Sequence, residues 1–551
     1  MRPVLAILGL IGLLSLPVSP LLANTLHRDR DPVVLTGLAL PTLLGANPDS
    51  VVAFRYQAGW VPIPVQVDER AVVNFGTIYN DTTGSGFTIL TYTDASTFTG
   101  PDPDPTFDTD DELVFMAKEA GDQLAGSPGP QGTLAGSGVV VSIQNPINSA
   151  VGYVYLFKSD GSLDPGPGAD PVTNAFYLLP SGASYKSQYD TRTGPNPENT
   201  VISSANYSVH FSDRWICNAI QVTAGGATGV NILDRRKDLF APGNCTRSET
   251  TFSNGEGALI VNRQGPVRAL RGYCGANSGP TTYRIHKFYE SREDVLTALR
   301  VHPIPGIVDF FDYSAAAAGM TYVNDLNLSG VTIDGTPDAV TLGAIQWEMV
   351  TGPQGSLAIT HLVGTDIPSF AFTSYYRDLS PAPNQCTGDG SEFGSSGIRI
   401  ATDIPNTDPA LGAYYRFEPT RIIAYAGPGQ SAAFAQAAAL EAQSAPTATA
   451  IAYVPTGVIG ENNALAFRLT IGPQPVSARA RFHFTLPADG DFSVRIYDVA
   501  GRLVATPVLQ RMPAGPHDLA WDAKVLSVGV YFVHARLAGV GQRAVKLVVA
   551  R

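Results

Sequence analysis

The sequence predicts an all-β protein, built from an N-terminal β domain, a large central β-sandwich, one short helix and a small C-terminal β-sandwich. Three observations lead to this fold class. Short runs of β-branched and aromatic residues alternate with polar residues at a period of two. Gly and Pro contribute 55 and 42 of the 551 residues, which provides many turns but stays below the proportion typical of disordered chains. Residues 431–443 alone combine many Ala residues into a strong helical segment.

The first residues have the three-part layout of a secretory signal peptide. Arg2 precedes an apolar run at residues 4–16, Pro17 ends that run, and a short segment leads to Ala23. The run is too short for a comfortable membrane span. We therefore expect residues 1–23 to be a signal peptide cleaved between Ala23 and Asn24, and the mature protein to be secreted or held at a bacterial cell surface.

Residues 24–180 are expected to form the N-terminal β domain. Val139, Val141 and Ile143 alternate with polar neighbours, which is the signature of a half-buried strand. The run at 61–67 contains two prolines, so it is an edge strand at best. The predicted strands are 51–55, 61–67, 87–92, 113–116, 138–143 and 151–157.

The remainder of the chain divides into four segments. Residues 181–428 repeat the β pattern with longer strands, such as 283–289 and 295–301, and predict the central β-sandwich. Residues 429–445 contain the Ala-rich helix. Residues 446–465 are rich in Pro, Thr and Gly and are interpreted as a linker. Residues 466–551 return to clean alternation and predict an independent sandwich.

The formal net charge of −12 is unevenly distributed along the chain. Residues 466–551 contain eleven Lys and Arg against five Asp, a balance of +6, so the preceding residues carry −18. An acidic body does not suit a polyphosphate backbone, and we expect no nucleic-acid partner. The basic C-terminal domain is suited to contact an acidic cell surface.

Four cysteines lie in the middle of the chain: Cys217, Cys245, Cys274 and Cys386. In an exported protein an even number indicates disulfides, and four cysteines allow three pairings. We favour Cys217 with Cys245 and Cys274 with Cys386. Buried thiols are the alternative, because four cysteines are few for a chain of this length.

The C-terminal domain carries an ordered set of short motifs, namely Asp498-Val-Ala-Gly-Arg502, Trp521-Asp522, Gly529-Val-Tyr531 and a last strand containing Lys546. With these motifs it resembles the C-terminal sorting domain of the type IX (Por) secretion pathway and the related Ig-like module of flagellar hook-capping proteins. The resemblance implies an Ig-like β-sandwich that addresses its passenger through the outer-membrane secretion machinery. An Ig-like cap without a sorting role is the alternative.

Residues 60–69 and 107–115 of the body are similar to the opening of secreted bacterial β proteins related to polysaccharide lyases of the rhamnogalacturonan-lyase kind. This resemblance implies that the central domain is a galactose-mutarotase-like supersandwich. It covers a few dozen residues and includes no catalytic residue.

One acidic segment offers oxygen ligands for a hard cation: Asp102, Asp104, Asp108, Asp110 and Glu112. Ca²⁺ takes about six to eight oxygen ligands, so calcium is the candidate ion, and we expect no other cofactor. The spacing does not match an EF-hand loop. A solvated acidic loop that leads into a strand is the alternative.

The candidate catalytic residues are Arg271, Arg284, His286 and Tyr289. On a strand at 283–289, Arg284 and His286 point to one face, whereas Tyr289 joins them only if a bulge turns it. Such a set suits an acidic sugar, since Arg neutralises a carboxylate and His or Tyr removes the neighbouring proton. Ordinary cross-strand Arg and Glu pairs on an exposed sheet face are the alternative.

Two further groups of residues stand out in the sequence. Trp347, Tyr375 and Tyr376 are candidates for a sugar-stacking platform, although single aromatics in β proteins more often belong to the core. The run Asp234-Arg-Arg-Lys-Asp238 is interpreted as a charged turn.

The sequence contains no G-x-S-x-G, Walker A or H-E-x-x-H motif, which argues against serine-hydrolase, nucleotide-hydrolase and zinc-hydrolase chemistry. The predicted function is therefore that of a secreted or cell-surface β protein whose body is a glycan-binding or structural module. A polysaccharide-lyase-like enzyme that acts on an acidic glycan is the alternative.

Overall fold

The computed structural model describes residues 26–551 except 79–85, 125–126, 180–195, 242–244, 246, 255–256, 276–280, 301–303, 368–369, 384, 405–415, 455–466, 473, 475, 499–501, 538–540 and 551. The chain forms two compact units, Met1–Pro455 and Thr456–Arg551. The predicted signal peptide, with Ala23 and Asn24, lies outside the described residues. Within the described ranges, no helix is long and apolar enough to cross a membrane.

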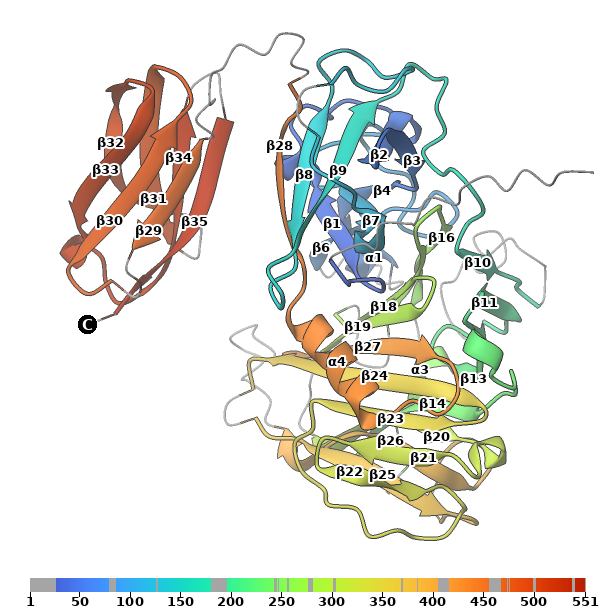
Figure 1. The fold of residues 1–551 in the computed structure, drawn as a ribbon. Coiled ribbons are helices and arrows are strands. Elements are labelled where there is room, and N and C mark those ends of the chain that lie inside the picture. Colours follow the sequence, from blue (N-terminus) through green and yellow to red (C-terminus); the bar gives the residue numbers. More distant parts are fainter. Residues whose placement is uncertain are drawn as a thin grey trace, which may run out of the picture. The chain divides into compact units, whose positions relative to one another are not determined.

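The N-terminal part of the first unit is a small sandwich whose two main sheets share one apolar core (Figure 1). One sheet has the order β1 (Pro32–Thr36), β7 (Glu112–Met116), β4 (Gln66–Asp68). The other has the order β28 (Thr447–Ala452), β8 (Val139–Gln144), β9 (Val151–Lys158), β2 (Val51–Tyr56), β3 (Trp60–Ile63). A hairpin of β5 (Arg70–Asn74) and β6 (Thr88–Tyr92) and the short helix α1 (Phe75–Ile78) lie beside them.

The central part contains the largest sheet of the described chain, with nine antiparallel strands. Its order is β16 (Ala258–Gln264), β17 (Ala269–Cys274), β18 (Tyr283–Phe288), β19 (Arg292–Arg300), β27 (Arg416–Ala426), β24 (Gly355–Thr365), β23 (Trp347–Gly352), β21 (Thr321–Asn324), β22 (Asn327–Thr332).

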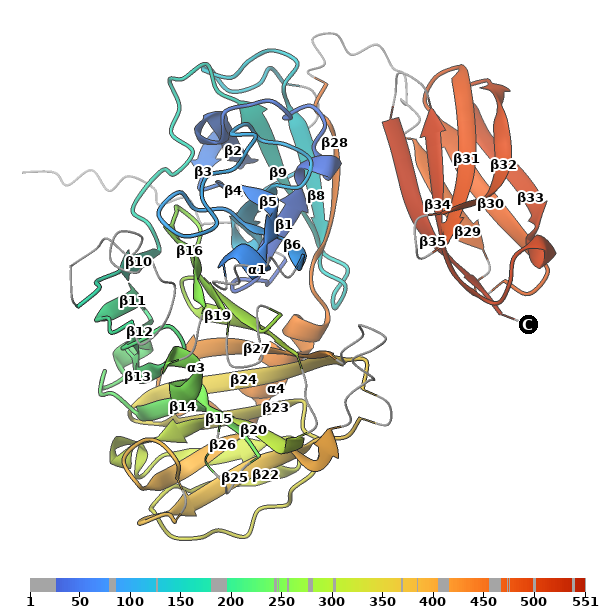
Figure 2. The same ribbon diagram turned by 180° about the vertical axis from the view of Figure 1, so that it is seen from behind.

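Two smaller sheets supply the opposite layer of the central sandwich (Figures 1 and 2). The first has the order β10 (Val172–Ala175), β11 (Thr200–Ser204), β12 (Tyr207–Phe211), β13 (Cys217–Val222). The second has the order β15 (Arg247–Ser248), β14 (Leu233–Phe240), β20 (Ile304–Tyr313), β26 (Glu392–Ile404), β25 (Thr373–Leu379), with helix α3 (Glu249–Asn254) beside β15.

One apolar core joins these three sheets, because Val209 of β12, Phe311 of β20 and Ile423 of β27 belong to the same buried cluster. The opposite face of the nine-stranded sheet is covered by helix α4 (Ala432–Gln443), which packs Ala435 and Ala439 over β23 and β24. Small side chains allow this close approach. The structure thus confirms the all-β class with one short Ala-rich helix.

The second unit is a small sandwich of two sheets. Their orders are β29 (Arg468–Gly472), β30 (Arg479–Leu486), β33 (Gly515–Asp522) and β32 (Leu503–Met512), β31 (Gly490–Asp498), β34 (Gly529–Leu537), β35 (Gly541–Val549). The predicted alternation is present, since Phe482, Phe484 and Phe492 are buried between polar neighbours. The last strand, β35, stands at the end of its sheet.

Three expectations about individual segments have different outcomes. The proline-containing strand β3 stands at the edge of its sheet, as predicted. The charged run at 234–238 is not a turn but part of the buried strand β14, so that prediction is wrong. Part of the predicted linker, Thr447–Ala452, is strand β28 and pairs with β8 across its whole length.

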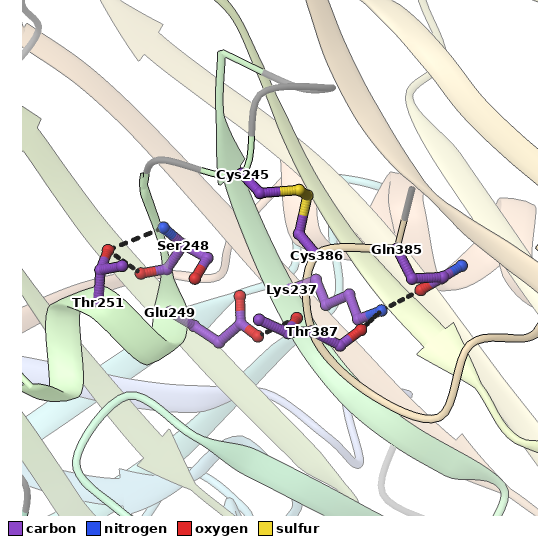
Figure 3. The surroundings of a disulfide bond; sticks show 8 residues. All are labelled: Lys237, Cys245, Ser248, Glu249, Thr251, Gln385, Cys386 and Thr387. Atoms are coloured by element: carbon purple, nitrogen blue, oxygen red, sulfur yellow. Dashed lines mark hydrogen bonds between the residues drawn. A yellow bond between two sulfur atoms is a disulfide. The ribbon is translucent and has the colours of Figure 1, made fainter. Parts of the chain in front are cut away.

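The cysteine pairing also differs from the expectation. The structure has a disulfide between Cys245 and Cys386, which lie 141 residues apart in sequence (Figure 3). Both favoured pairings are therefore wrong. Cys217 and Cys274 are thiols in the apolar core on strands β13 and β17, as in the alternative that the sequence left open for them.

Candidate functional site

The four predicted catalytic residues lie on or directly after two neighbouring strands of the nine-stranded sheet. Arg271 of β17 stands directly opposite His286 of β18 in the antiparallel register. Arg284 shares the face of His286, and Tyr289 lies on the other side, packed with Val267. The predicted alternation is correct, but the four side chains are only 0–1% exposed. They face the protein interior, so the alternative of an exposed sheet face is wrong, and the candidate catalytic set itself has almost no exposed surface.

Arg271 and Arg284 are each held by a carboxylate from another part of the chain. The two guanidinium Nη atoms of Arg271 donate to both oxygens of Glu198, at 2.5 and 3.0 Å. Those of Arg284 donate to both oxygens of Asp238, on β14 of the opposite sheet, at 3.0 and 3.1 Å. In such bidentate pairs both Nη atoms of the guanidinium already donate to a carboxylate. Neither Arg therefore has a free pair of Nη donors for a substrate carboxylate.

His286 is part of a hydrogen-bonded chain between the two layers. Its Nδ1 is 2.8 Å from Glu293 Oε1, and its Nε2 is 2.8 Å from the Tyr273 hydroxyl. Glu293 also accepts two bonds of 2.7 Å from Arg236 and one of 2.8 Å from Tyr425. The imidazole therefore has a partner on both nitrogens, which suits a neutral ring that donates from Nδ1 and accepts at Nε2.

For both His286 and Glu293, burial and charge pairing shift the pKa in opposite directions. Burial lowers the pKa of His286 to about 3, despite the neighbouring Glu293 carboxylate, so the ring stays neutral at ordinary pH. Burial alone would raise the pKa of Glu293, but the Arg236 guanidinium holds it well below its usual value. A neutral His and an ionised Glu that are both shielded from solvent form a structural pair.

Tyr289 belongs to a second network, at the junction with the N-terminal sandwich. Its hydroxyl accepts from Arg268 Nη1 at 3.2 Å. Arg268 also binds Asp68 at 2.7 Å and Glu112 at 2.8 Å. This arginine also donates to the Tyr92 hydroxyl at 3.4 Å and has no exposed surface, so its four partners replace water around it.

The predicted calcium ligands do not come together as one site. Among the described residues, no three His, Cys, Asp or Glu side chains are arranged to hold a metal ion. Glu112 faces the Arg268 network, where its oxygens accept from Arg70, Arg268 and Tyr92. Asp102, Asp104 and Asp108 accept backbone N–H bonds within the loop itself, as in ordinary turns.

The predicted stacking platform is also absent as a unit. Trp347 lies on β23, buried with Met349 beneath helix α4. Tyr375 and Tyr376 belong to β25 of the other sheet, and their hydroxyls donate to Glu392 and Asp338 respectively. The three aromatics therefore serve separate parts of the body, and the prediction that they form one platform is wrong.

The carboxylates that pair with the predicted cations were missed by the sequence reasoning. Glu198, Asp238 and Glu293 are distant in sequence from their arginine partners, so spacing gave no signal for them. The run at 234–238 was the one available hint, because its alternate residues Arg236 and Asp238 point into the sandwich once the run is a strand. Lys237, between them, points to the outer face of the same sheet, against Phe310.

The second unit contains an open groove of about 490 Å³ on the outer face of the sheet β32-β31-β34-β35. Arg495, Arg511 and Arg536 line it, together with Tyr497 and His534. These three arginines make no ion pair within the part of the chain that the structure describes. Here, in contrast to the body, the guanidinium groups face solvent.

Comparisons with known proteins give no family. No protein-family model and no curated protein matches the chain. A glycosyl hydrolase family 38 protein from Enterococcus faecalis is similar over 89% of this chain and 55% of its own, at 10% identity and a TM-score of 0.39. A polysaccharide lyase is similar over 63% of this chain and 47% of its own, at 8% identity and a TM-score of 0.23.

A further similar structure is PorZ, a surface component of the type IX secretion system of Porphyromonas gingivalis. The similarity covers 64% of this chain and 69% of that protein, at 10% identity and a TM-score of 0.12. These likenesses are too weak to assign an activity or a partner.

Proposed function

We propose that this protein is a secreted or cell-surface protein with a rigid, non-catalytic β body and a C-terminal domain that binds an acidic glycan. One observation carries the proposal: the buried arginines Arg236, Arg271 and Arg284 of the body are paired with internal carboxylates, whereas the arginines around the C-terminal groove are open. The domain would then attach the body to an acidic polymer of an envelope or matrix.

Catalysis at the predicted body site would require a substrate to reach side chains that lie between two packed layers. Arg284 would have to release Asp238, and His286 would have to release Glu293 and Tyr273. Breaking one buried pair costs about 3–5 kcal/mol, and this site contains several. The network is therefore better suited to join the layers than to bind a sugar.

The C-terminal groove has the chemistry that an acidic glycan needs. Guanidinium groups bind carboxylates through two parallel hydrogen bonds, and Arg495 and Arg536 project from the neighbouring strands β31 and β34. Tyr497 offers an aromatic surface in the same groove. The surplus of six positive charges in residues 466–551 would also attract a polyanion over a distance.

The test is binding of the full chain to immobilised polygalacturonate. We expect the double variant Arg495→Ala, Arg536→Ala to bind at least about tenfold more weakly, since each lost contact of this kind is worth about 1 kcal/mol or more. The matched control is Arg479→Ala, Arg481→Ala, which removes the same charge from exposed positions on the other sheet. Equal weakening by both variants would show that net charge alone accounts for the binding. It would refute the groove as the binding site.

The delivery of the protein is a separate proposal, which rests on the resemblance of residues 466–551 to sorting domains. Deletion of these residues should retain the passenger inside the envelope of a bacterium that has the pathway. Normal release of the truncated chain would refute sorting and leave the domain with a binding role alone.

The alternative of a polysaccharide-lyase-like enzyme is tested by absorbance of unsaturated sugar products. We expect no product from uronate polymers, with or without Ca²⁺. Product formation that His286→Ala abolishes would overturn the non-catalytic body.

A further inference from the structure

Lys237 occupies an unusual position in the body. Among the described residues it is the only lysine that is fully buried, with a side-chain exposure of 0%. The other fully buried cations in this unit are arginines, including Arg236, Arg268 and Arg284. This difference matters because a lysine amine can lose a proton and become a nucleophile, whereas a guanidinium remains charged.

The partner of Lys237 is a carboxylate on the adjacent strand. In the register of β14 and β20, Lys237 faces Phe310 and Arg235 faces Asp312, so Lys237 and Asp312 are diagonal neighbours on one face. Lys237 Nζ lies 2.5 Å from Asp312 Oδ2, and Asp312 has no exposed side-chain surface. The amine and the carboxyl group are therefore held together without intervening water.

The pair is enclosed by apolar groups and by a covalently fixed segment. Leu239, Val308 and Phe310 form an apolar cluster on this face. Gln385 and the Thr387 carbonyl accept from Lys237 Nζ, on either side of Cys386 in the disulfide with Cys245 (Figure 3). The segment thus covers the amine and limits its movement.

The carboxyl group is held in place and is readily protonated. Ser395 donates to Asp312 Oδ1 at 2.5 Å, which leaves Oδ2 directed at the amine. Burial raises the pKa of Asp312 to about 7, in spite of Lys237, and the nearby carboxylate of Glu392 adds to the increase. The neutral acid form of Asp312 is therefore accessible near neutral pH, with the Lys237 amine directly beside it.

We propose that Lys237 and Asp312 condense into an intramolecular isopeptide bond that covalently joins β14 to β20. The ammonium first transfers one proton to Oδ2. The lone pair of Nζ then attacks Asp312 Cγ and forms the N–C bond. The buried carboxylate of Glu392 takes a second proton from Nζ and passes it to the Oδ2 hydroxyl. The C–Oδ2 bond then breaks and releases one water, while one hydrogen stays on the amide nitrogen. The step consumes no oxidant or reductant, and confinement of the two groups replaces the activation that an amide bond otherwise requires.

Such a bond would strengthen the outer sheet of the body independently of any ligand. It goes beyond the proposed function, because it does not depend on glycan binding. The bond would prevent β14 and β20 from separating when an anchored protein is pulled, which non-covalent strand pairing alone cannot do.

The test is mass spectrometry of the intact, disulfide-reduced protein. Loss of one water makes the wild-type chain about 18 Da lighter than its sequence. We expect Lys237→Arg, which keeps the charge but cannot condense, to have its full sequence mass. Lys287→Arg is the matched control on another lysine with little exposed surface, on β18, whose amine lies 3.9 Å from Glu112, and it should retain the loss. Tryptic digestion of the wild type should also yield one branched peptide that contains both Lys237 and Asp312.

Two results would overturn the proposal. A wild-type chain of full sequence mass, with trypsin cleaving after Lys237, would show that no bond forms. A loss of water that persists in Lys237→Arg would place the dehydration elsewhere in the chain. The wild-type mass together with the presence or absence of the branched wild-type peptide is decisive, so the result does not depend on whether a variant folds.

Discussion

The two units of this protein use the same kind of charged side chain in opposite ways. In the body, Arg236 and Arg284 lie between sheets and bind Glu293 and Asp238, and these side chains are at most 3% exposed. In the C-terminal unit, Arg495 and Arg536 project from a sheet face into an open groove. Both sets lie on β-strands, in which successive side chains point to opposite faces, so the difference does not come from the local sequence pattern. It comes from whether a second layer covers the strand.

This contrast teaches that cations on a strand do not by themselves indicate a binding site. A buried guanidinium is tolerated only when carboxylates replace its water shell. The body carries the acidic surplus that provides these partners, whereas the C-terminal domain has eleven cations and only five acids. The uneven charge distribution therefore matches a paired interior in one unit and an open basic surface in the other.

The largest expected effect is the removal of a buried partner. Glu293→Gln leaves Arg236 with a neutral partner in the interior and should lower the free energy of unfolding of the body by about 3–5 kcal/mol. Glu418→Gln makes the same change in the half-exposed pair with Arg416, and should cost less than about 1 kcal/mol. Urea unfolding measures both. Similar values for the two variants would mean that Glu293 is not a buried partner.

A smaller effect is expected from the disulfide, which closes a long loop. Replacement of Cys245 and Cys386 by Ala should cost about 2–4 kcal/mol, because the unfolded chain regains freedom over 141 residues. Thermal unfolding with and without reductant provides the measurement. Peptide mapping under non-reducing conditions checks the pairing, and a peptide that joins Cys217 to Cys245 would contradict the structure.

A still smaller effect concerns pH. His286 has a folded pKa of about 3, below the value near 6.5 of an unfolded chain, so only the unfolded state binds a proton between these limits. Stability from this group therefore falls as the pH decreases from about 6.5, by about 1.4 kcal/mol per pH unit. The difference in unfolding free energy between wild type and His286→Gln should change with this slope between about pH 6 and 4.5. A difference independent of pH would indicate a protonated or exposed ring.

The sequence alone was sufficient to predict the strands that have one apolar and one polar face. Phe482 and Phe484 alternate with exposed polar residues, and Pro62 marks an edge strand, because each of these signals is local. It was also sufficient for the opposite orientation of His286 and Tyr289. These features depend only on the geometry of a single strand.

The sequence was insufficient wherever a distant partner decides the environment. The run at 234–238 looks like a solvated turn until Glu293, 57 residues away, binds Arg236. Trp347 looks like a surface platform until helix α4 covers it. The same applies to the cysteines, since Cys245 and Cys386 are adjacent only after the sheets form. Long-range pairing of this kind leaves no periodic signal.

The contrast between a closed interior and an open surface can be measured directly by deuterium exchange at the histidine C2 position. His286 is buried and bonded on both nitrogens, whereas His534 lies in the C-terminal groove. Mass spectrometry of the full chain after incubation in D₂O should show exchange at His534 and almost none at His286. Exchange at His286 as fast as at His534 would show that solvent reaches the predicted catalytic face, and would contradict the structural role of the body network.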